Sequence, residues 1–151
     1  MENNRLMAQS ILLVEDSTDD YEATIRAFQK ANLHNPVTWC RSGQEAIDFL
    51  SHEGAYSDSI AEQPGLVLLD LNMPGLDGRS TLRFIKETDK LKRIPIIILT
   101  TSSDARDVEE CYQLGANTYV QKPISFEGLV ETIRRIKEYW FETALLPKDG
   151  I

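Results

Sequence analysis

Five polar residues stand at the ends of apolar segments in this sequence, and their types suit phosphoryl chemistry. They are Glu15, Asp16, Asp70, Thr100 and Lys122. Brought together, the three carboxylates would raise one another's pKa unless a counter-ion were present. Mg²⁺ is a hard cation that takes carboxylate oxygens together with waters and phosphate oxygens, so it is the metal that such a cluster predicts. The lysine and the threonine hydroxyl add donors suited to a phosphoryl group.

The segments that carry these residues predict strands that alternate with helices. Short apolar runs predict strands, and stretches with apolar residues three and four positions apart predict helices. The strands are expected at residues 11–14, 37–40, 66–69, 94–99 and 117–121. The helices are expected at about residues 18–33, 43–50 and 79–88, from Ser103 or Asp104 to Gly115, and from Ser125 onward. Residues 51–64 are a polar interlude that predicts a loop or a frayed helix end.

This alternation predicts an α/β fold with a doubly wound five-stranded parallel sheet and helices on both faces. The expected strand order is 2-1-3-4-5, in a flavodoxin-like three-layer sandwich with an extended C-terminal helix and tail. In this order the winding direction changes between the first and third strands, which carry the acids. Because the carboxyl ends of parallel strands meet at one edge, Glu15, Asp16 and Asp70 are expected to converge there.

Length and charge restrict the class of protein. The 151 residues predict a single domain, with a core at about residues 10–137 and a tail at residues 138–151. With 16 Lys and Arg against 24 Asp and Glu, the net charge is −8, which argues against nucleic acid and anionic membrane as partners. The apolar runs are far shorter than a membrane span, and residues 1–10 lack the apolar core of a signal peptide. Two cysteines without metal-type spacing predict reduced thiols in a cytoplasmic protein.

Four motifs, taken in order, resemble the receiver domain of two-component response regulators over roughly residues 10–137. They are residues 12–16 (LLVED), residues 68–74 (LLDLNMP) with the following Asp77 and Gly78, residues 99–101 (LTT) and residues 119–123 (YVQKP). One motif alone would be weak evidence, but all of them in order, at the ends of the predicted strands, form a specific signal. The resemblance implies a signalling module controlled by phosphorylation.

The resemblance also implies a role for each residue of the set. Asp70 would accept a phosphoryl group from a phosphohistidine on a sensor histidine kinase, and Thr100 and Lys122 would bind the phosphoryl oxygens. The implied ligands of Mg²⁺ are Glu15, Asp16, Asp70 and the backbone carbonyl of Asn72. Glu15 stands where aspartate is commoner, so its contact with the metal could run through water.

A switch is implied by the same resemblance. Once phosphate is present, the Thr100 hydroxyl would move towards it and Tyr119 would fill the vacated space, which is a shift of populations by a few kcal/mol at most. A role for Tyr119 in simple packing is the alternative. The resemblance further implies a cis peptide bond between Lys122 and Pro123, although trans is the commoner state before proline.

The C-terminal tail and the polar interlude resemble those of one subgroup within the response regulators. Residues 138–147 (EYWFETALLP) and the long loop at residues 51–64 are similar to those of the small single-domain response regulators of phytochrome two-component systems. This resemblance implies a light-regulated histidine kinase as phosphodonor and a homodimer through the last helix and strand region. Because only a short tail follows Lys137, output is expected through protein contacts, either directly or by relay to a histidine phosphotransfer protein. One helix face cannot bury three consecutive aromatics, so an interface is expected, and a tail folded back on its own domain is the alternative. The candidate dimer residues are Tyr139, Trp140, Phe141 and Leu145.

Other functions share parts of this pattern. A Mg²⁺-dependent aspartyl-phosphate phosphatase of the haloacid-dehalogenase type needs a second acid two positions after its nucleophile, where this chain has Asn72. A flavodoxin-like electron carrier needs a hydroxyl- and glycine-rich loop after the first strand, where this chain has Glu15 and Asp16. The Gly-x-Gly-x-x-Gly fingerprint of dinucleotide enzymes is missing. Solvated strand-end acids, or a scaffold that needs no phosphorylation, remain as alternatives, and we expect a phosphoacceptor switch rather than an enzyme.

Overall fold

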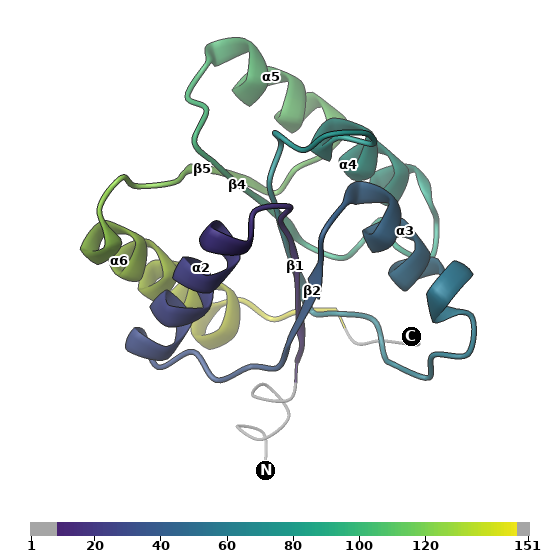
Figure 1. Ribbon diagram of the computed structural model, residues 1–151, viewed down its shortest axis with the longest axis horizontal. Coiled ribbons are helices and arrows are strands. Elements are labelled where there is room, and N and C mark those ends of the chain that lie inside the picture. The colour runs from purple at the N-terminus through teal and green to yellow at the C-terminus, as the bar shows by residue number, and fades with distance from the viewer. Residues whose placement is uncertain (1–8, 148–151) are drawn as a thin grey trace.

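A parallel sheet forms the centre of the fold (Figure 1). The protein is represented by a computed structural model, which describes residues 9–147. The strands are β1 (Ile11–Val14), β2 (Val37–Cys40), β3 (Leu66–Leu69), β4 (Ile96–Thr100) and β5 (Thr118–Gln121). They pair in parallel in the order β2-β1-β3-β4-β5, which confirms the predicted order. Every residue of β1, β3 and β4 is buried, as expected for strands covered on both faces.

Helices cover both faces of the sheet (Figure 1). One layer contains α2 (Thr18–Lys30) and α6 (Phe126–Lys137), and the other contains α3 (Gly43–Ser51), α4 (Gly78–Glu87) and α5 (Ala105–Leu114). A 3₁₀ turn, η1 (Gly54–Tyr56), lies in the predicted loop, and a π-helical turn, η2 (Glu138–Thr143), continues α6. This arrangement confirms the predicted doubly wound α/β fold. None of the helices within residues 9–147 is both long and apolar enough to cross a bilayer.

Each of the five α-helices within the described residues begins at a side chain that accepts a hydrogen bond from the first turn. These caps are Ser17, Ser42, Asp77, Asp104 and Ser125. Such caps satisfy backbone N–H groups that a helix leaves without a partner at its start. Of the two caps predicted for α5, Asp104 is the one used, and its side chain accepts from the N–H of Arg106 at 2.8 Å. The caps therefore fix where the chain turns from the sheet into each helix.

The start of β4 differs from the prediction. The strand begins at Ile96 rather than at residue 94, because Pro95 has no N–H to donate to a ladder. The carbonyl of Pro95 instead accepts from the N–H of Val67 at 3.0 Å. At its other end β4 extends to Thr100, so this threonine belongs to the strand instead of following it.

A tyrosine of α5 covers part of the free edge of β5. The hydroxyl of Tyr112 accepts a hydrogen bond from the backbone N–H of Tyr119 at 3.1 Å. Gly115 ends α5 in the left-handed conformation, with φ at 107°, and this sharp turn leads the chain directly into β5. A backbone donor that no neighbouring strand accepts thus finds its partner within the chain.

Gly78 allows α4 to begin directly against the end of β3. An added Cβ would lie 2.3 Å from the backbone oxygen of Asp70 and 2.7 Å from the Cα of Leu71, and backbone atoms cannot move aside as a flexible side chain can. We expect Gly78→Ala to lower the free energy of unfolding by about 3 kcal/mol, as measured by urea denaturation. For the control Ser80→Ala, at an exposed position of the same helix, we expect a change below about 0.5 kcal/mol. Equal losses in the two variants would contradict this interpretation.

Candidate metal-binding and phosphoryl-transfer site

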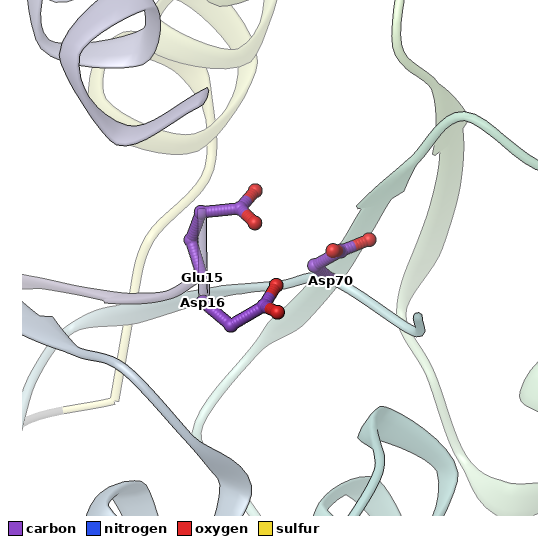
Figure 2. Close-up of side chains that lie close together, drawn as sticks. All are labelled: Glu15, Asp16 and Asp70. Carbon is purple, nitrogen blue, oxygen red and sulfur yellow. The ribbon is translucent and has the colours of Figure 1, made fainter. Parts of the chain in front are cut away.

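Three carboxylates converge at the carboxyl edge of the sheet. Glu15 and Asp16 follow β1, and Asp70 follows β3. These strands are neighbours, with Val14 opposite Leu69, and the N–H of Asp70 donates to the carbonyl of Val14 at 3.1 Å. One carboxylate oxygen from each acid lies within 4.8 Å of the other two, and Figure 2 shows Glu15 and Asp16 turned towards the strand end that carries Asp70. Strand pairing therefore brings together acids that are far apart in the sequence.

The burial and chemistry of this cluster fit a divalent metal ion. Glu15 is 2% exposed and Asp70 is 9% exposed, whereas Asp16 is open to solvent. The cluster is therefore largely buried, and it is accessible to solvent on the side of Asp16. Against three carboxylates, Lys122 supplies a single positive charge, so a further cation would relieve the repulsion between the acids. Because these side-chain donors are all carboxylate oxygens, the site suits a hard cation and not a metal that prefers sulfur.

Lys122 reaches the acids from the end of β5. Its Nζ lies 2.6 Å from Glu15 Oε1 and 3.6 Å from Asp20 Oδ2, and its side chain is 11% exposed. Burial raises the pKa of Glu15 above its ordinary value, although the hydrogen bond and charge of Lys122 act in the opposite direction. Burial alone would lower the pKa of Lys122, but its pKa is raised because the hydrogen bond and charge of Glu15, with the charges of Asp70 and Asp20, together outweigh that effect. The predicted cis bond between Lys122 and Pro123 is wrong for this structure, where this peptide bond has the lower-energy trans form.

Thr100 and Asn72 meet beside the acids. Thr100 is completely buried, and its Oγ1 accepts a hydrogen bond from Asn72 Nδ2 at 3.4 Å. The backbone carbonyl of Thr100 accepts from the N–H of Lys122 at 2.6 Å. Asn72 itself is exposed and lies two residues beyond Asp70. The structure therefore places the predicted hydroxyl and the predicted lysine on neighbouring strand ends, next to the loop that follows Asp70.

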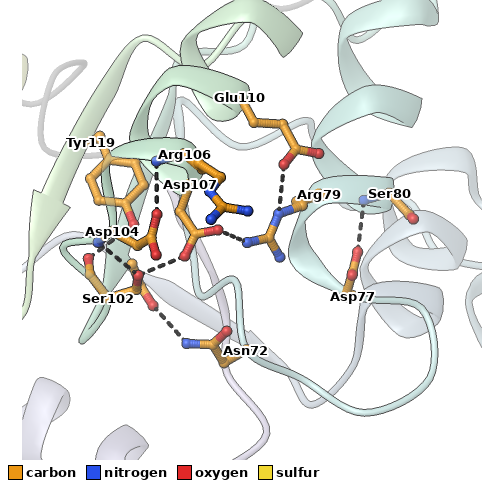
Figure 3. A network of polar contacts seen from close by, with 11 residues as sticks. Asn72, Asp77, Arg79, Ser80, Ser102, Asp104, Arg106, Asp107, Glu110 and Tyr119 are labelled. Atoms are coloured by element: carbon orange, nitrogen blue, oxygen red, sulfur yellow. Dashed lines mark hydrogen bonds and ion pairs between the residues drawn. The ribbon is translucent and has the colours of Figure 1, made fainter.

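Tyr119 belongs to a polar network that the sequence does not reveal (Figure 3). Its hydroxyl donates to the backbone carbonyl of Ser102 at 2.9 Å, and the Ser102 hydroxyl donates to Asp107 Oδ2 at 2.6 Å. Asp107 also forms an ion pair with Arg79, whose Nε lies 3.2 Å from Glu110 Oε2. The hydrogen bond from Ser102, together with Arg79, holds the pKa of Asp107 below its ordinary value. The network joins α4 and α5 to the loop after β4 and to the ring of Tyr119.

The four candidate dimer residues of the tail divide into two groups. Tyr139 and Leu145 are 56% and 93% exposed. Phe141 is 6% exposed and packs into the core between the sheet and the α2–α6 layer, and Trp140 is half-buried against the same core. Of the dimer candidates, Phe141 is buried within its own domain, because the π-helical turn directs its ring inward and folds this part of the tail back, as in the alternative expected for the tail.

Known proteins match this chain over most of its length. Residues 11–134 match the family described as the response regulator receiver domain. The probable methanogenesis regulatory protein FilR2 of Methanothrix harundinacea is 40% identical over 131 residues, which cover 86% of this chain and 82% of FilR2. The response regulator Rcp1 of Synechocystis is 39% identical over 137 residues, which cover 91% of this chain and 92% of Rcp1.

Solved structures match the fold as well. The phosphorylated cyanobacterial phytochrome response regulator RcpA superposes with a TM-score of 0.87 at 38% identity, over 93% of this chain and 99% of RcpA. The Mn²⁺-bound form of Rcp1 gives a TM-score of 0.84 at 37% identity, over 93% of this chain and 99% of Rcp1. These matches do not support the alternative of a haloacid-dehalogenase phosphatase. With its five parallel strands, its acid cluster and these relatives, the chain belongs to the response regulator receiver domain family.

Proposed function

We propose that this chain accepts a phosphoryl group on Asp70 from a phosphohistidine of a sensor histidine kinase, and that it signals through protein contacts and not as an enzyme. The observation that carries the proposal is the convergence of Glu15, Asp16 and Asp70 within 4.8 Å, with the ammonium of Lys122 bonded to Glu15. Membership of the receiver family supports a two-component kinase as the donor.

Asp70 is the nucleophile in this proposal. One of its carboxylate oxygens attacks the phosphorus atom in line, while the bond from phosphorus to the histidine nitrogen breaks and the imidazole leaves. The proposed metal is Mg²⁺, whose charge would offset the acids and the phosphoryl oxygens when it is bound. Its proposed ligands are Glu15, Asp16, Asp70 and the backbone carbonyl of Asn72. The Mn²⁺-bound form of the relative Rcp1 supports a divalent cation in this family.

Lys122 and Thr100 bind the phosphoryl oxygens in this proposal. An ammonium has three N–H donors, so Lys122 can keep its bond to Glu15 and still donate to a phosphoryl oxygen. The Thr100 hydroxyl, whose oxygen accepts from the amide of Asn72, would turn its own hydrogen towards a phosphoryl oxygen. Tyr119 would then fill the vacated space and give up its bond to the Ser102 carbonyl, which makes the network around α5 the proposed readout of phosphorylation.

The proposed partners follow from the relatives and from the surface. RcpA is a phytochrome response regulator, which supports a phytochrome-type kinase as donor, with a histidine phosphotransfer protein as a possible acceptor. The net charge of −8 argues against nucleic acid and membrane as partners. We place the protein in the cytoplasm, which is supported by two free cysteines whose thiols are buried. Burial raises the pKa of Cys40 to about 12 and that of Cys111 to about 11, so both thiols stay protonated.

Labelling by a small acyl phosphate tests the proposed function. The protein is incubated with the phosphodonor in the presence and absence of Mg²⁺, and its intact mass is measured. We expect one added phosphoryl group with Mg²⁺ and little labelling without it. A native protein that stays unlabelled in the presence of Mg²⁺ would overturn the proposal. Steady release of phosphate from simple phosphate monoesters would instead favour a phosphatase.

We also propose that the chain forms a homodimer whose contact includes the exposed tail residues Tyr139 and Leu145. We expect the double variant Tyr139→Ser, Leu145→Ser to weaken the dimer about tenfold or more, because the exposed apolar groups at positions 139 and 145 are lost. Sedimentation equilibrium measures the change. The matched control is Ile60→Ser, which removes an apolar side chain about as exposed as Leu145 from the loop before β3. A dimer that is unaffected by the double variant, or a native protein that is monomeric, would exclude this interface.

A further inference from the structure

Trp39 of β2 contacts the acid site through the backbone and not through the carboxylates. Its indole N–H donates to the backbone carbonyl of Glu15 at 2.7 Å. The backbone N–H of Glu15 donates in turn to the carbonyl of Cys40 at 3.0 Å. Both backbone groups of Glu15 are therefore bonded to β2, one through the main chain and one through a side chain. The ladder of β1 ends at Val14, so the indole extends this support one residue beyond the strand.

The indole is itself held in a defined orientation. The ring of Tyr21, in the first turn of α2, stacks on it with centroids 3.8 Å apart and an interplanar angle of 6°. The guanidinium of Arg41 lies over the indole at 4.3 Å from the ring centroid, which adds a cation–π contact. These contacts restrict rotation of the side chain of Trp39, so its N–H stays directed at the Glu15 carbonyl.

The bonded carbonyl belongs to the peptide group that joins Glu15 to Asp16. If the plane of that peptide is fixed, the backbone position from which the Asp16 side chain leaves is fixed as well. Asp16 is exposed, and its carboxylate is not held by a salt bridge among the described residues. Its placement beside Asp70 therefore depends strongly on the backbone.

We propose that Trp39 is a positioning residue for the metal-binding acids, acting through the Glu15–Asp16 peptide. The inference rests on the proposed function, since it assigns to Trp39 the task of orienting the carboxylates that would hold the divalent cation. Groups that orient metal ligands from outside the coordination sphere commonly contribute between tenfold and a hundredfold to metal affinity. Trp39 touches neither the metal nor the phosphoryl group in this assignment.

Mn²⁺ affinity tests the proposal, with Trp140 as the matched control. Trp39→Phe keeps an aromatic ring for Tyr21 but removes the N–H donor, and Trp140→Phe removes an indole from η2, the turn that follows α6. Free Mn²⁺ is measured by electron paramagnetic resonance during titration of each folded protein. We expect the Kd for Mn²⁺ to rise about tenfold in Trp39→Phe and to stay within twofold of the native value in Trp140→Phe.

A second measurement uses the native protein and does not depend on the folding of a variant. The two indole N–H groups give separate signals in a proton–nitrogen correlation spectrum, and Mg²⁺ is added. We expect the Trp39 indole signal to shift together with the backbone amides of Glu15 and Asp16, while the Trp140 signal stays in place. If Trp39 had a purely structural role, Trp39→Phe would lower the stability of the protein without changing its affinity for metal.

The outcomes separate the two proposals. If the native protein binds Mn²⁺ but Trp39→Phe binds it equally well, the positioning role is overturned and the metal site stands. If the Trp39 signal stays fixed while the amides of Glu15 and Asp16 shift, the positioning role is likewise overturned. A native protein that binds no Mn²⁺ would overturn the metal site and the positioning role together.

Discussion

Asp70→Asn is expected to abolish phosphoryl incorporation from a small acyl phosphate, to below the detection limit of intact-mass measurement. The carboxamide has no ionised oxygen that could attack phosphorus, and the substitution also removes one of the three carboxylates of the cluster. The native protein and the variant are compared in the same Mg²⁺-containing buffer, with labelling followed over time.

Stability distinguishes lost chemistry from lost folding in this experiment. Asp70 carries a charge that raises the pKa of Glu15, so its replacement by a neutral amide should leave the folded protein at least as stable as the native one. The control is Asp89→Asn, an almost fully exposed acid that should label like the native protein. Continued labelling of folded Asp70→Asn would mean that another residue accepts the phosphoryl group.

Lys122→Met is expected to cost about 3–5 kcal/mol of unfolding free energy at neutral pH, in buffer free of divalent metal. The side chain of Glu15 is 3% exposed, and its Oε1 accepts from Lys122 Nζ at 2.6 Å. Without the ammonium, the Glu15 carboxylate would remain buried without this partner, beside Asp16 and Asp70. For comparison, Lys92→Met removes an exposed lysine paired with exposed Asp89 and should cost less than about 1 kcal/mol.

The pH dependence of this loss has a definite sign. The pKa of Glu15 is already raised by burial, and removal of Lys122 raises it further because the lysine acts to lower it. An acid with a raised pKa in the folded state loses stability as the pH rises through that pKa, since ionisation then favours the unfolded chain. The deficit of Lys122→Met should therefore grow as the pH rises above 4.5, the ordinary value for this glutamate, and should be small in acid.

Urea denaturation at about pH 5 and about pH 7 measures this difference. A second substitution, Glu15→Gln, should recover part of the stability of Lys122→Met, because it removes the buried charge that lost its partner. A deficit that is the same at both pH values, or no larger than that of Lys92→Met, would show that the Lys122–Glu15 pair contributes little to folding.

The fold could be predicted because its signals are local. Residues 11–14 and 66–69 are short continuous apolar runs, as expected for strands covered on both faces, and both strands have these bounds. The helix starts follow from short polar caps such as Ser42 and Ser125. The start of β4 was misplaced by two residues because Ile94 is apolar and buried although it lies before the strand. The pattern of apolar residues indicates which residues are buried, but it does not indicate which of them pair with a neighbouring strand.

The acids of the site could also be predicted, since the topology of a parallel sheet brings the ends of β1 and β3 to one edge. The side chains that hold these acids in place could not be predicted from the sequence. Arg79 and Asp107 meet across two helices, and the indole of Trp39 reaches Glu15 from a neighbouring strand. No sequence spacing encodes such contacts, because they depend on how helices and strands pack. Phe141 is a similar case, because the direction of its ring is set by a π-helical turn that residue types do not signal.

The hydroxyl of Tyr112 bears on how the protein behaves when crowded. A strand at the margin of an open sheet can add a strand from another molecule through its outer N–H groups, and such additions start aggregation. At β5 the N–H of Tyr119 is already bonded to Tyr112, so an incoming strand would have to displace that side chain to gain this hydrogen bond. Tyr112 thereby blocks one of the hydrogen bonds through which β5 could add a strand from another molecule.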